Sequence, residues 1–350
     1  MDLYQRLVRP CLFRLPPDTA HDLALRVLAW PAPWRLVGRG PFPNPRLATD
    51  LCGIPLANPV GLAPGLDKDC DALAGLMHLG FGFLAPGAIM RDVRAGNPRP
   101  RLGRLVEQEA LLNCMGLPSK GRAHAIARLE RLQERTVPIV AELQGVSPAE
   151  IVETTAALQP HADATAVGLE CPNTAAAERE SVLAGVLDLV YRLGEVRTRP
   201  LFAKVPNHFR LERPDRLPAF LDACIDAGLD GVIASGTGRA VAPQLSLGQG
   251  TISGRPVFQA TRDLVCAIAD HAGDRLAIVA AGGVSTGRDA YEMLGAGASA
   301  VMILSVLIYR GPLAPRLINQ ELLAVLEAEG VPSVRALAER RHAAPAIPSA

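Results

Sequence analysis

The sequence has very little lysine and no pattern of paired cysteines. Only three of the 36 cationic side chains in this 350-residue chain are lysines: Lys68, Lys120 and Lys204. Arginine supplies positive charge almost everywhere, so we expect lysine to remain where a compact ammonium is needed. The seven cysteines are scattered, without a C-x-x-C spacing or a His/Cys cluster. They predict neither disulfides nor a metal site, and they suit a reducing cytoplasm.

Long apolar runs and a strong net charge are also missing. No stretch of 18 apolar residues occurs, and the chain does not open with the pattern of a signal peptide. We therefore expect neither a membrane span nor secretion. The formal net charge is +1, and no basic cluster contains interleaved aromatic residues. Nucleic acid is thus not an expected partner. With 49% hydrophobic residues, the chain can bury a large core.

Residues 1–42 differ from the rest and predict an amphipathic helical hairpin. Apolar residues recur at helical spacing on both sides of the break Pro16-Pro17-Asp18. The segment carries six arginines against three aspartates, a balance of +3, and both tryptophans, Trp30 and Trp34. Basic helices with aromatic anchors suit peripheral contact with a membrane, here through residues 1–40 at the inner face of the cell membrane. The alternative is a hairpin that only packs on its own barrel.

Eight short apolar runs alternate with helical patterns after residue 56. They lie at residues 59–63, 81–86, 138–143, 164–169, 201–205, 231–234, 276–281 and 300–304. Eight β/α units predict an α/β fold, a (β/α)₈ TIM barrel over residues 43–340, with catalytic groups where the strands end. The segment 89–137 has room for a lid-like excursion and a helix, and residues 341–350 are expected to be a flexible tail.

The run at 164–169 stops at a reactive side chain, Cys171, in the loop that follows. A free cysteine is often just a small buried hydrophobe. Its place after a barrel strand, shared with Lys68, Lys204 and Ser235, favours a catalytic role instead. Lys204 ends an otherwise apolar strand and needs an anion or another partner there, because an unpaired buried charge is costly.

Glycine-containing segments lie late in the predicted barrel. They are Ser253-Gly-Arg-Pro256, Ala280-Ala-Gly-Gly283, and Leu304-Ser305 followed by Arg310-Gly-Pro312. Barrels of this kind hold a phosphate on backbone N–H groups at such turns. Ordinary tight turns are the alternative, since the chain has 32 glycines.

Together these residues resemble the membrane-associated, quinone-using class of dihydroorotate dehydrogenases. The likeness covers nearly the whole chain. It rests on the motifs Arg9-Pro-Cys-Leu-Phe13, Asn58-Pro-Val-Gly-Leu-Ala63, Gly65-Leu-Asp-Lys-Asp69, Gly96-Asn-Pro-Arg-Pro-Arg101, Cys171-Pro-Asn-Thr174, Ser253-Gly-Arg-Pro256 and Gly282-Gly283. The resemblance implies a barrel that binds FMN, a small substrate, a quinone or other electron acceptor, and a role in pyrimidine biosynthesis.

The resemblance also assigns site residues. Those implied for FMN are Ala63, Gly65, Lys68, Ala88, Glu142, Lys204, Ser235, Gly254, Gly282, Gly283, Leu304 and Ser305. Those implied for the substrate are Lys68, Asn113, Met115, Gly116, Leu117, Gly168, Asn173, Gly236 and Thr237. His21 and Arg101 are implied to reach a quinone tunnel under the hairpin, and Cys171 takes the place of the catalytic base.

Several of these positions depart from the family pattern. This class carries serine where Cys171 stands, although a thiolate can also accept a substrate proton. The family places substrate-binding asparagines where this chain has Gly168 and Gly236. The other departures are Glu142 for a flavin-contacting asparagine, Ala88 for threonine, Leu117 for phenylalanine and Glu170 for serine. Each lost amide removes a partner from the substrate ring.

These departures leave three interpretations open. The leading one is an FMN oxidoreductase of this family that transfers a hydride to flavin N5, with Cys171 as base, from a substrate altered from dihydroorotate. Glu142 and Glu170 hint at a cationic or amine-bearing substrate. The second is an authentic dihydroorotate dehydrogenase. The third, a flavin-binding protein without catalysis, is disfavoured because both Lys68 and Lys204 remain in a lysine-poor chain.

Overall fold

A closed barrel of eight parallel strands forms the centre of the protein. The computed structural model describes residues 3–38, 40–169, 179–207, 209 and 213–343. The strands pair in the order β4-β3-β16-β15-β12-β11-β10-β9, and a bridge between Leu84 and Ile139 closes the ring. They are β3 (Val60–Leu62), β4 (Phe83–Leu84), β9 (Val140–Leu143), β10 (Ala164–Gly168), β11 (Leu201–Lys204), β12 (Gly231–Ser235), β15 (Ala277–Ala281) and β16 (Ala300–Ile303). The predicted TIM barrel and its eight strands are confirmed.

The barrel strands are short apolar runs because both of their faces are covered. Large side chains such as Phe83, Phe202 and Met302 fill the interior of the barrel together with small alanines. The opposite side chains pack against the surrounding helices. A hairpin of β1 (Thr49–Leu51) and β2 (Ile54–Leu56) puts Leu51 and Leu56 into the interior cluster at the N-terminal end of the barrel. The opposite end of the barrel carries the site.

Helices surround the barrel, and side-chain caps mark some of their starts. Ser147 accepts a hydrogen bond from the Glu150 N–H at 3.3 Å, and Thr286 forms a capping box with Asp289. The helices after the N-terminal segment are α4 (Leu73–Leu76), α5 (Arg122–Glu130), α6 (Pro148–Leu158), α7 (Arg179–Glu195), α9 (Leu217–Asp226), α10 (Phe258–Ala272), α11 (Gly287–Gly295), α12 (Ser305–Arg310), α13 (Ala314–Ala328) and α14 (Val334–Ala343). Short 3₁₀ turns are η2 (Gln159–His161), η3 (Pro214–Arg216), η4 (Arg255–Val257) and η5 (Gly273–Arg275). α14 reaches three residues past position 340, where the predicted barrel ends.

Two excursions from the barrel join into a second, antiparallel sheet in the order β13-β14-β7-β6. β6 (Leu102–Leu105) and β7 (Ala110–Asn113) come from the long segment after β4. β13 (Gly238–Val241) and β14 (Gln249–Gly254) come from the segment after β12. A further small pair consists of β5 (Val93–Arg94) and β8 (Ser119–Lys120). The sequence predicted the first excursion and its helix α5, but not the strands of the second.

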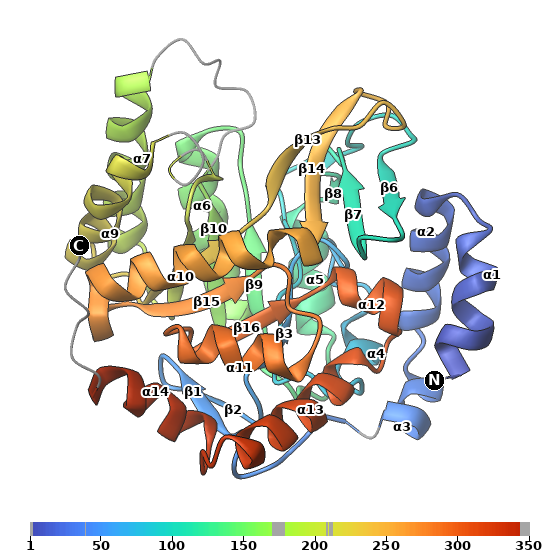
Figure 1. Cartoon of the computed structure of the whole chain (residues 1–350). Coiled ribbons are helices and arrows are strands. Elements are labelled where there is room, and N and C mark those ends of the chain that lie inside the picture. The colour runs from blue at the N-terminus through green and yellow to red at the C-terminus, as the bar shows by residue number, and fades with distance from the viewer. Residues whose placement is uncertain (1–2, 39, 170–178, 208, 210–212, 344–350) are drawn as a thin grey trace.

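The N-terminal segment forms the predicted helical hairpin and one further helix. A π-helical turn, η1 (Tyr4–Val8), continues into α1 (Arg9–Phe13), and α2 (Pro17–Leu28) returns beside β6 (Figure 1). The additional helix, α3 (Pro31–Gly38), begins at a proline. Proline is tolerated in the first turn of a helix, so Pro31 starts α3 instead of ending the helical segment.

Polar contacts bind the hairpin to the rest of the protein. The buried Asp18 carboxylate on α2 accepts hydrogen bonds from the backbone N–H of Arg101 at 3.1 Å and of Leu102 at 3.3 Å. Arg104 stacks on Phe13 with 4.7 Å between guanidinium and ring centre. The Tyr4 hydroxyl donates to the Ile308 carbonyl of α12 at 2.8 Å. The hairpin therefore lies against both the antiparallel sheet and the end of the barrel.

Candidate active site

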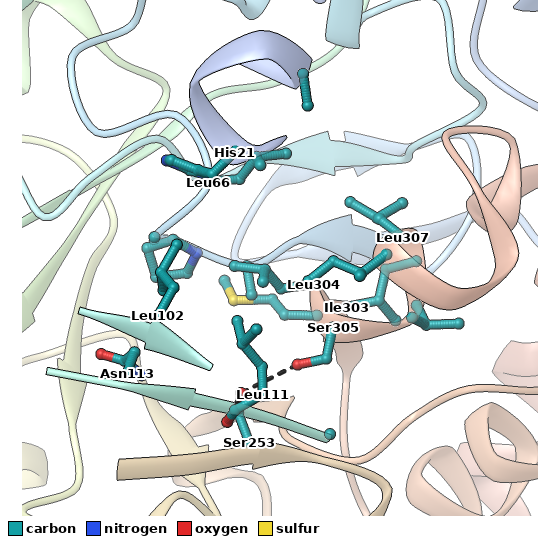
Figure 2. Close-up of a pocket in the computed structure, with 18 of the residues that line it drawn as sticks. His21, Leu66, Leu102, Leu111, Asn113, Ser253, Ile303, Leu304, Ser305 and Leu307 are labelled. Atoms are coloured by element: carbon teal, nitrogen blue, oxygen red, sulfur yellow. Dashed lines mark hydrogen bonds between the residues drawn. The ribbon is translucent and has the colours of Figure 1, made fainter. Parts of the chain in front are cut away.

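A cavity of about 950 Å³ lies between the barrel, the antiparallel sheet and the hairpin. Figure 2 shows His21 on its helix at one side, Asn113, Leu111 and Ser253 on strands at the other, and Leu304 and Ser305 between them. Polar side chains and glycines line the part next to the barrel, whereas leucines and valines line the part under the hairpin. One cavity thus has two chemically unlike ends.

Lys204 and Glu142 form an ion pair at the barrel end of the cavity. Lys204 is the last residue of β11, and Glu142 lies within β9. The Nζ atom of Lys204 is 3.7 Å from Oε1 of Glu142. Burial raises the pKa of the Glu142 carboxyl, and the nearby lysine opposes that shift. The other carboxylate oxygen, Oε2, is buried without a hydrogen-bond partner among the described residues. Glu142 therefore faces the cavity, where its first role is to balance the charge of Lys204.

Glycines and hydroxyls that line the same cavity as this ion pair form a cradle. The backbone at Gly283 has φ 81°, and a Cβ there would lie 2.4 Å from the Cα of Phe258. Gly254 likewise has φ 98°. Only glycine fits such a conformation at such close approach. The Ser253 and Ser305 hydroxyls are 3.0 Å apart at the same place. The cradle matches the geometry in which backbone groups and hydroxyls hold a phosphate.

Lys68 lies in the loop after β3 and is half-buried between two cavities. Its ammonium donates to the Gly65 carbonyl. Burial, followed by the charge of Arg101, lowers the Lys68 pKa to about 8. Asp67 orders this loop, because its carboxylate accepts from the backbone N–H of Asp71 and Ala72, both at 2.9 Å. Lys68 is thus a positioned cation at neutral pH.

Amides and hydroxyls face the cavity from strands β7 and β14 and from the segments after β11 and β12. The Asn113 amide donates to the Thr251 hydroxyl at 2.8 Å, which joins β7 to β14. The Thr237 hydroxyl donates to the side-chain oxygen of Asn207 at 3.4 Å. These groups offer both donors and acceptors to a polar ring.

The structure brings most of the predicted site residues together. Those that line the main cavity are His21, Ala63, Gly65, Lys68, Ala88, Asn113, Met115, Leu117, Glu142, Lys204, Ser235, Thr237, Gly254, Gly282, Gly283, Leu304 and Ser305. The predicted residues absent from its lining are Arg101, Gly116, Gly168 and Gly236. Cys171, Asn173 and Glu170 lie outside the described residues.

Arg101 and His21 both line a second cavity of about 520 Å³ beside Lys68. Arg101 Nε lies 3.5 Å from the Asp18 carboxylate, so this arginine helps to attach the hairpin. Of the two residues expected at the quinone tunnel, only His21 also reaches the main cavity.

His21 makes the attachment of the hairpin sensitive to acid. Burial, assisted by the charges of Lys68 and Arg101 and opposed by those of Asp22 and Asp18, lowers its pKa from 6.5 to about 4. Between these values the unfolded chain binds a proton that the folded chain does not, so stability is lost as the pH falls. We expect roughly 2 kcal/mol of loss from this group at pH 5. His21→Gln should therefore lose less stability than the wild type between pH 7 and pH 5, measured by guanidinium unfolding. Equal losses would show that His21 is readily protonated in the fold.

Apolar side chains surround the opening of the cavity between η1, α2 and α3. Leu3, Val27 and Val37 line it and are 68%, 44% and 56% exposed, and Trp30 nearby is 66% exposed. Trp34 differs from the expected anchor: its ring NH donates to the Val27 carbonyl at 2.9 Å, and its ring packs on the core. One of the two tryptophans is therefore available at the surface. Within the described part of the chain, no helix has the length and apolar character to cross a bilayer.

The polar residues of the cavity that the sequence did not predict as site residues include Gln144, Asn207 and Ser253. Gln144 directly follows the end of β9, and Asn207 follows β11 by three positions. The rule that barrel sites lie after strand ends applies to both. Ser253 was part of a recognised motif, but its pairing with Ser305 depends on β14, which the sequence did not predict.

The architecture is that of a (β/α)₈ barrel with a phosphate cradle and a hairpin over the strand ends. The sequence profile described as "Dihydroorotate dehydrogenase" matches residues 46–326. The chain belongs to the dihydroorotate dehydrogenase family, and it is an oxidoreductase of the kind that acts on CH–CH groups.

Known relatives match nearly the full length. The protein of Chloroflexus aurantiacus named "Dihydroorotate dehydrogenase (quinone)" is 36% identical over 91% of this chain and 96% of its own length. The one of Thermus thermophilus with the same name is 34% identical over 92% and 97%. Among solved structures, dihydroorotate dehydrogenase of Eimeria tenella in complex with ferulenol is 25% identical, with a TM-score of 0.81 over 95% of this chain and 99% of that one. These likenesses support the quinone-using class.

Proposed function

We propose that this protein oxidises dihydroorotate to orotate, with FMN bound in the barrel and a quinone as the final electron acceptor. The main support is the single cavity with two unlike ends. A polar end next to the barrel suits a small charged substrate, and an apolar end under the hairpin suits a quinone. The relatives named "Dihydroorotate dehydrogenase (quinone)" from Chloroflexus aurantiacus and Thermus thermophilus align over 91% and 92% of this chain.

The residues of the cradle fit FMN. Gly254, Gly283 and Ser305 would hold the phosphate, and Lys204 would lie near the ring system with Glu142 behind it. The buried Oε2 of Glu142 is an acceptor that a ring N–H can satisfy. When bound, FMN supplies the hydride acceptor of the reaction.

The chain's own residues would then orient the substrate and move one proton. Lys68 offers its ammonium to the substrate's carboxylate, and Asn113 offers an amide to its ring. Cys171, as thiolate, accepts the proton from the carbon next to the one that loses the hydride. The cover formed by the hairpin and the antiparallel sheet limits the access of water. These roles explain why this lysine-poor chain has lysine at positions 68 and 204.

A substrate altered from dihydroorotate is the second candidate, and one observation favours it. Neither Gly168 nor Gly236 can offer an amide, and the carboxylate of Glu142 reaches the cavity. A cationic or amine-bearing ring would suit that carboxylate. Against this stands Lys204, which already neutralises Glu142.

The proposed reaction is tested by steady-state turnover of dihydroorotate with a short-chain ubiquinone analogue, followed by the ultraviolet absorbance of orotate. We expect formation of orotate that requires the quinone. Turnover with ferricyanide but not with the quinone would leave dihydroorotate as the substrate and contradict the quinone assignment.

We further propose that the hairpin contacts the membrane. Its +3 balance and exposed apolar residues are the reason, and the attraction should weaken with salt. We expect deletion of residues 1–40 to leave a folded barrel that no longer sediments with anionic lipid vesicles. Trp30→Ala in the full chain tests one exposed side chain of the hairpin, and it should weaken sedimentation without abolishing it. Full-length protein that ignores such vesicles at low salt would mean that the hairpin is only a cover.

A further inference from the structure

Gln144 occupies the space in front of Gly168, at the end of the neighbouring strand. An ideal Cβ at Gly168 would lie 2.9 Å from Gln144 Cγ and 3.0 Å from both Cδ and Nε2. The register explains this proximity, because β9 and β10 pair with Leu143 opposite Val167. The next residues along, Gln144 and Gly168, are therefore opposite each other. A side chain at 168 and the present position of Gln144 exclude one another.

Gln144 lines the cavity in which the reaction is proposed to take place. It shares this cavity with Lys68, Asn113 and Lys204. Its backbone is fixed, since the Gln144 N–H donates to the Ile89 carbonyl at 3.1 Å. Glycine at 168 leaves β10 with no side chain at that point, so the amide comes from β9 instead.

We propose that Gln144 is a substrate-recognising residue that replaces the amide missing at position 168. A primary amide offers a donor and an acceptor side by side, which matches the adjacent C=O and N–H of a cyclic amide or ureide. Gly168 is then a requirement for Gln144, because it makes room for the longer side chain. The inference rests on the proposed function and assigns Gln144 to the ring of the substrate, beside the carboxylate bound by Lys68.

The test is the affinity of orotate for the oxidised, FMN-loaded protein, measured by the change in the visible absorption of the flavin. We expect Gln144→Ala to weaken orotate binding by roughly 10- to 100-fold while FMN stays bound. The matched control is Gln259→Ala, since Gln259 pairs with Asp263 at 2.7 Å on the exposed face of α10. This control should bind orotate as the wild type does.

A double variant separates the role of the amide from that of packing. Gly168→Asn alone should bind orotate poorly, because its Cβ meets Gln144. Gln144→Gly/Gly168→Asn moves the amide back to β10 and should recover most of the affinity. Gln144→Ala with the affinity of the control, or a flavin-loaded double variant no better than Gln144→Ala, would overturn the assignment. Failure of the assignment of Gln144 and failure of the proposed function give different results. If only the assignment fails, the wild-type protein still binds orotate. If the proposed function fails, the wild-type protein itself does not bind orotate.

Discussion

Cys171→Ala is expected to bind FMN and substrate but to be reduced by substrate far more slowly than the wild type. Only the proton transfer is lost, and a general base contributes roughly 10²- to 10⁴-fold to a rate. The rate should be followed as anaerobic bleaching of the flavin, which isolates the reductive half of the reaction from the acceptor. Cys11→Ala is the control, because Cys11 is exposed on α1.

Cys171→Ser tests whether the thiol itself matters. Serine is the residue of this class at that position, and its hydroxyl is less acidic than a thiol. Partial activity with a higher pH optimum is therefore expected. An alanine variant that bleaches at the wild-type rate would make Cys171 a bystander, and Glu170 in the same loop would be the next candidate for the base.

Lys204→Ala should weaken FMN binding by roughly 10- to 100-fold, because the proposed charged hydrogen bond from Lys204 to the cofactor would be lost. Lys120→Ala is the matched lysine control. Lys120 pairs with Asp71 at 2.7 Å and is absent from the lining of the main cavity. Retained FMN should be measured by absorbance after gel filtration and by titration of the apoprotein.

Removal of Lys204 also leaves Glu142 without its cation. A buried carboxylate that loses its partner is strongly destabilising, so the single variant can lose FMN through a damaged barrel. The double variant Lys204→Ala/Glu142→Gln removes both charges. We expect it to recover thermal stability but not FMN affinity. Recovery of both, or equal retention of FMN in Lys204→Ala and Lys120→Ala, would contradict direct contact between Lys204 and the cofactor.

The barrel could be predicted from the sequence because each strand is a short apolar run followed by a turn. Runs such as 164–169 and 276–281 are buried on both faces, and that burial is visible in their composition. The place of Lys204 followed from the same rule, since it ends an apolar strand. The rule that barrel sites lie at strand ends therefore predicted the residues that line the barrel end of the cavity.

The antiparallel sheet was not predictable in the same way. β13 and β14 are glycine-rich and partly exposed, and β14 pairs with β7, whose residue Asn113 lies opposite Thr251. Such pairing depends on contacts between distant parts of the chain rather than on local propensity. For the same reason, the sequence showed only that position 168 lacks the expected asparagine amide. It did not show that the side chain of Gln144 lies next to Gly168. The structure shows the side chain that fills the space.

Whether dihydroorotate is the substrate is decided by anaerobic mixing. Purified protein loaded with FMN should be mixed with dihydroorotate in the absence of oxygen and quinone. We expect the flavin to bleach and one orotate to form for each flavin reduced. A flavin that stays oxidised with saturating dihydroorotate, but bleaches with dithionite, would exclude dihydroorotate and favour a different substrate.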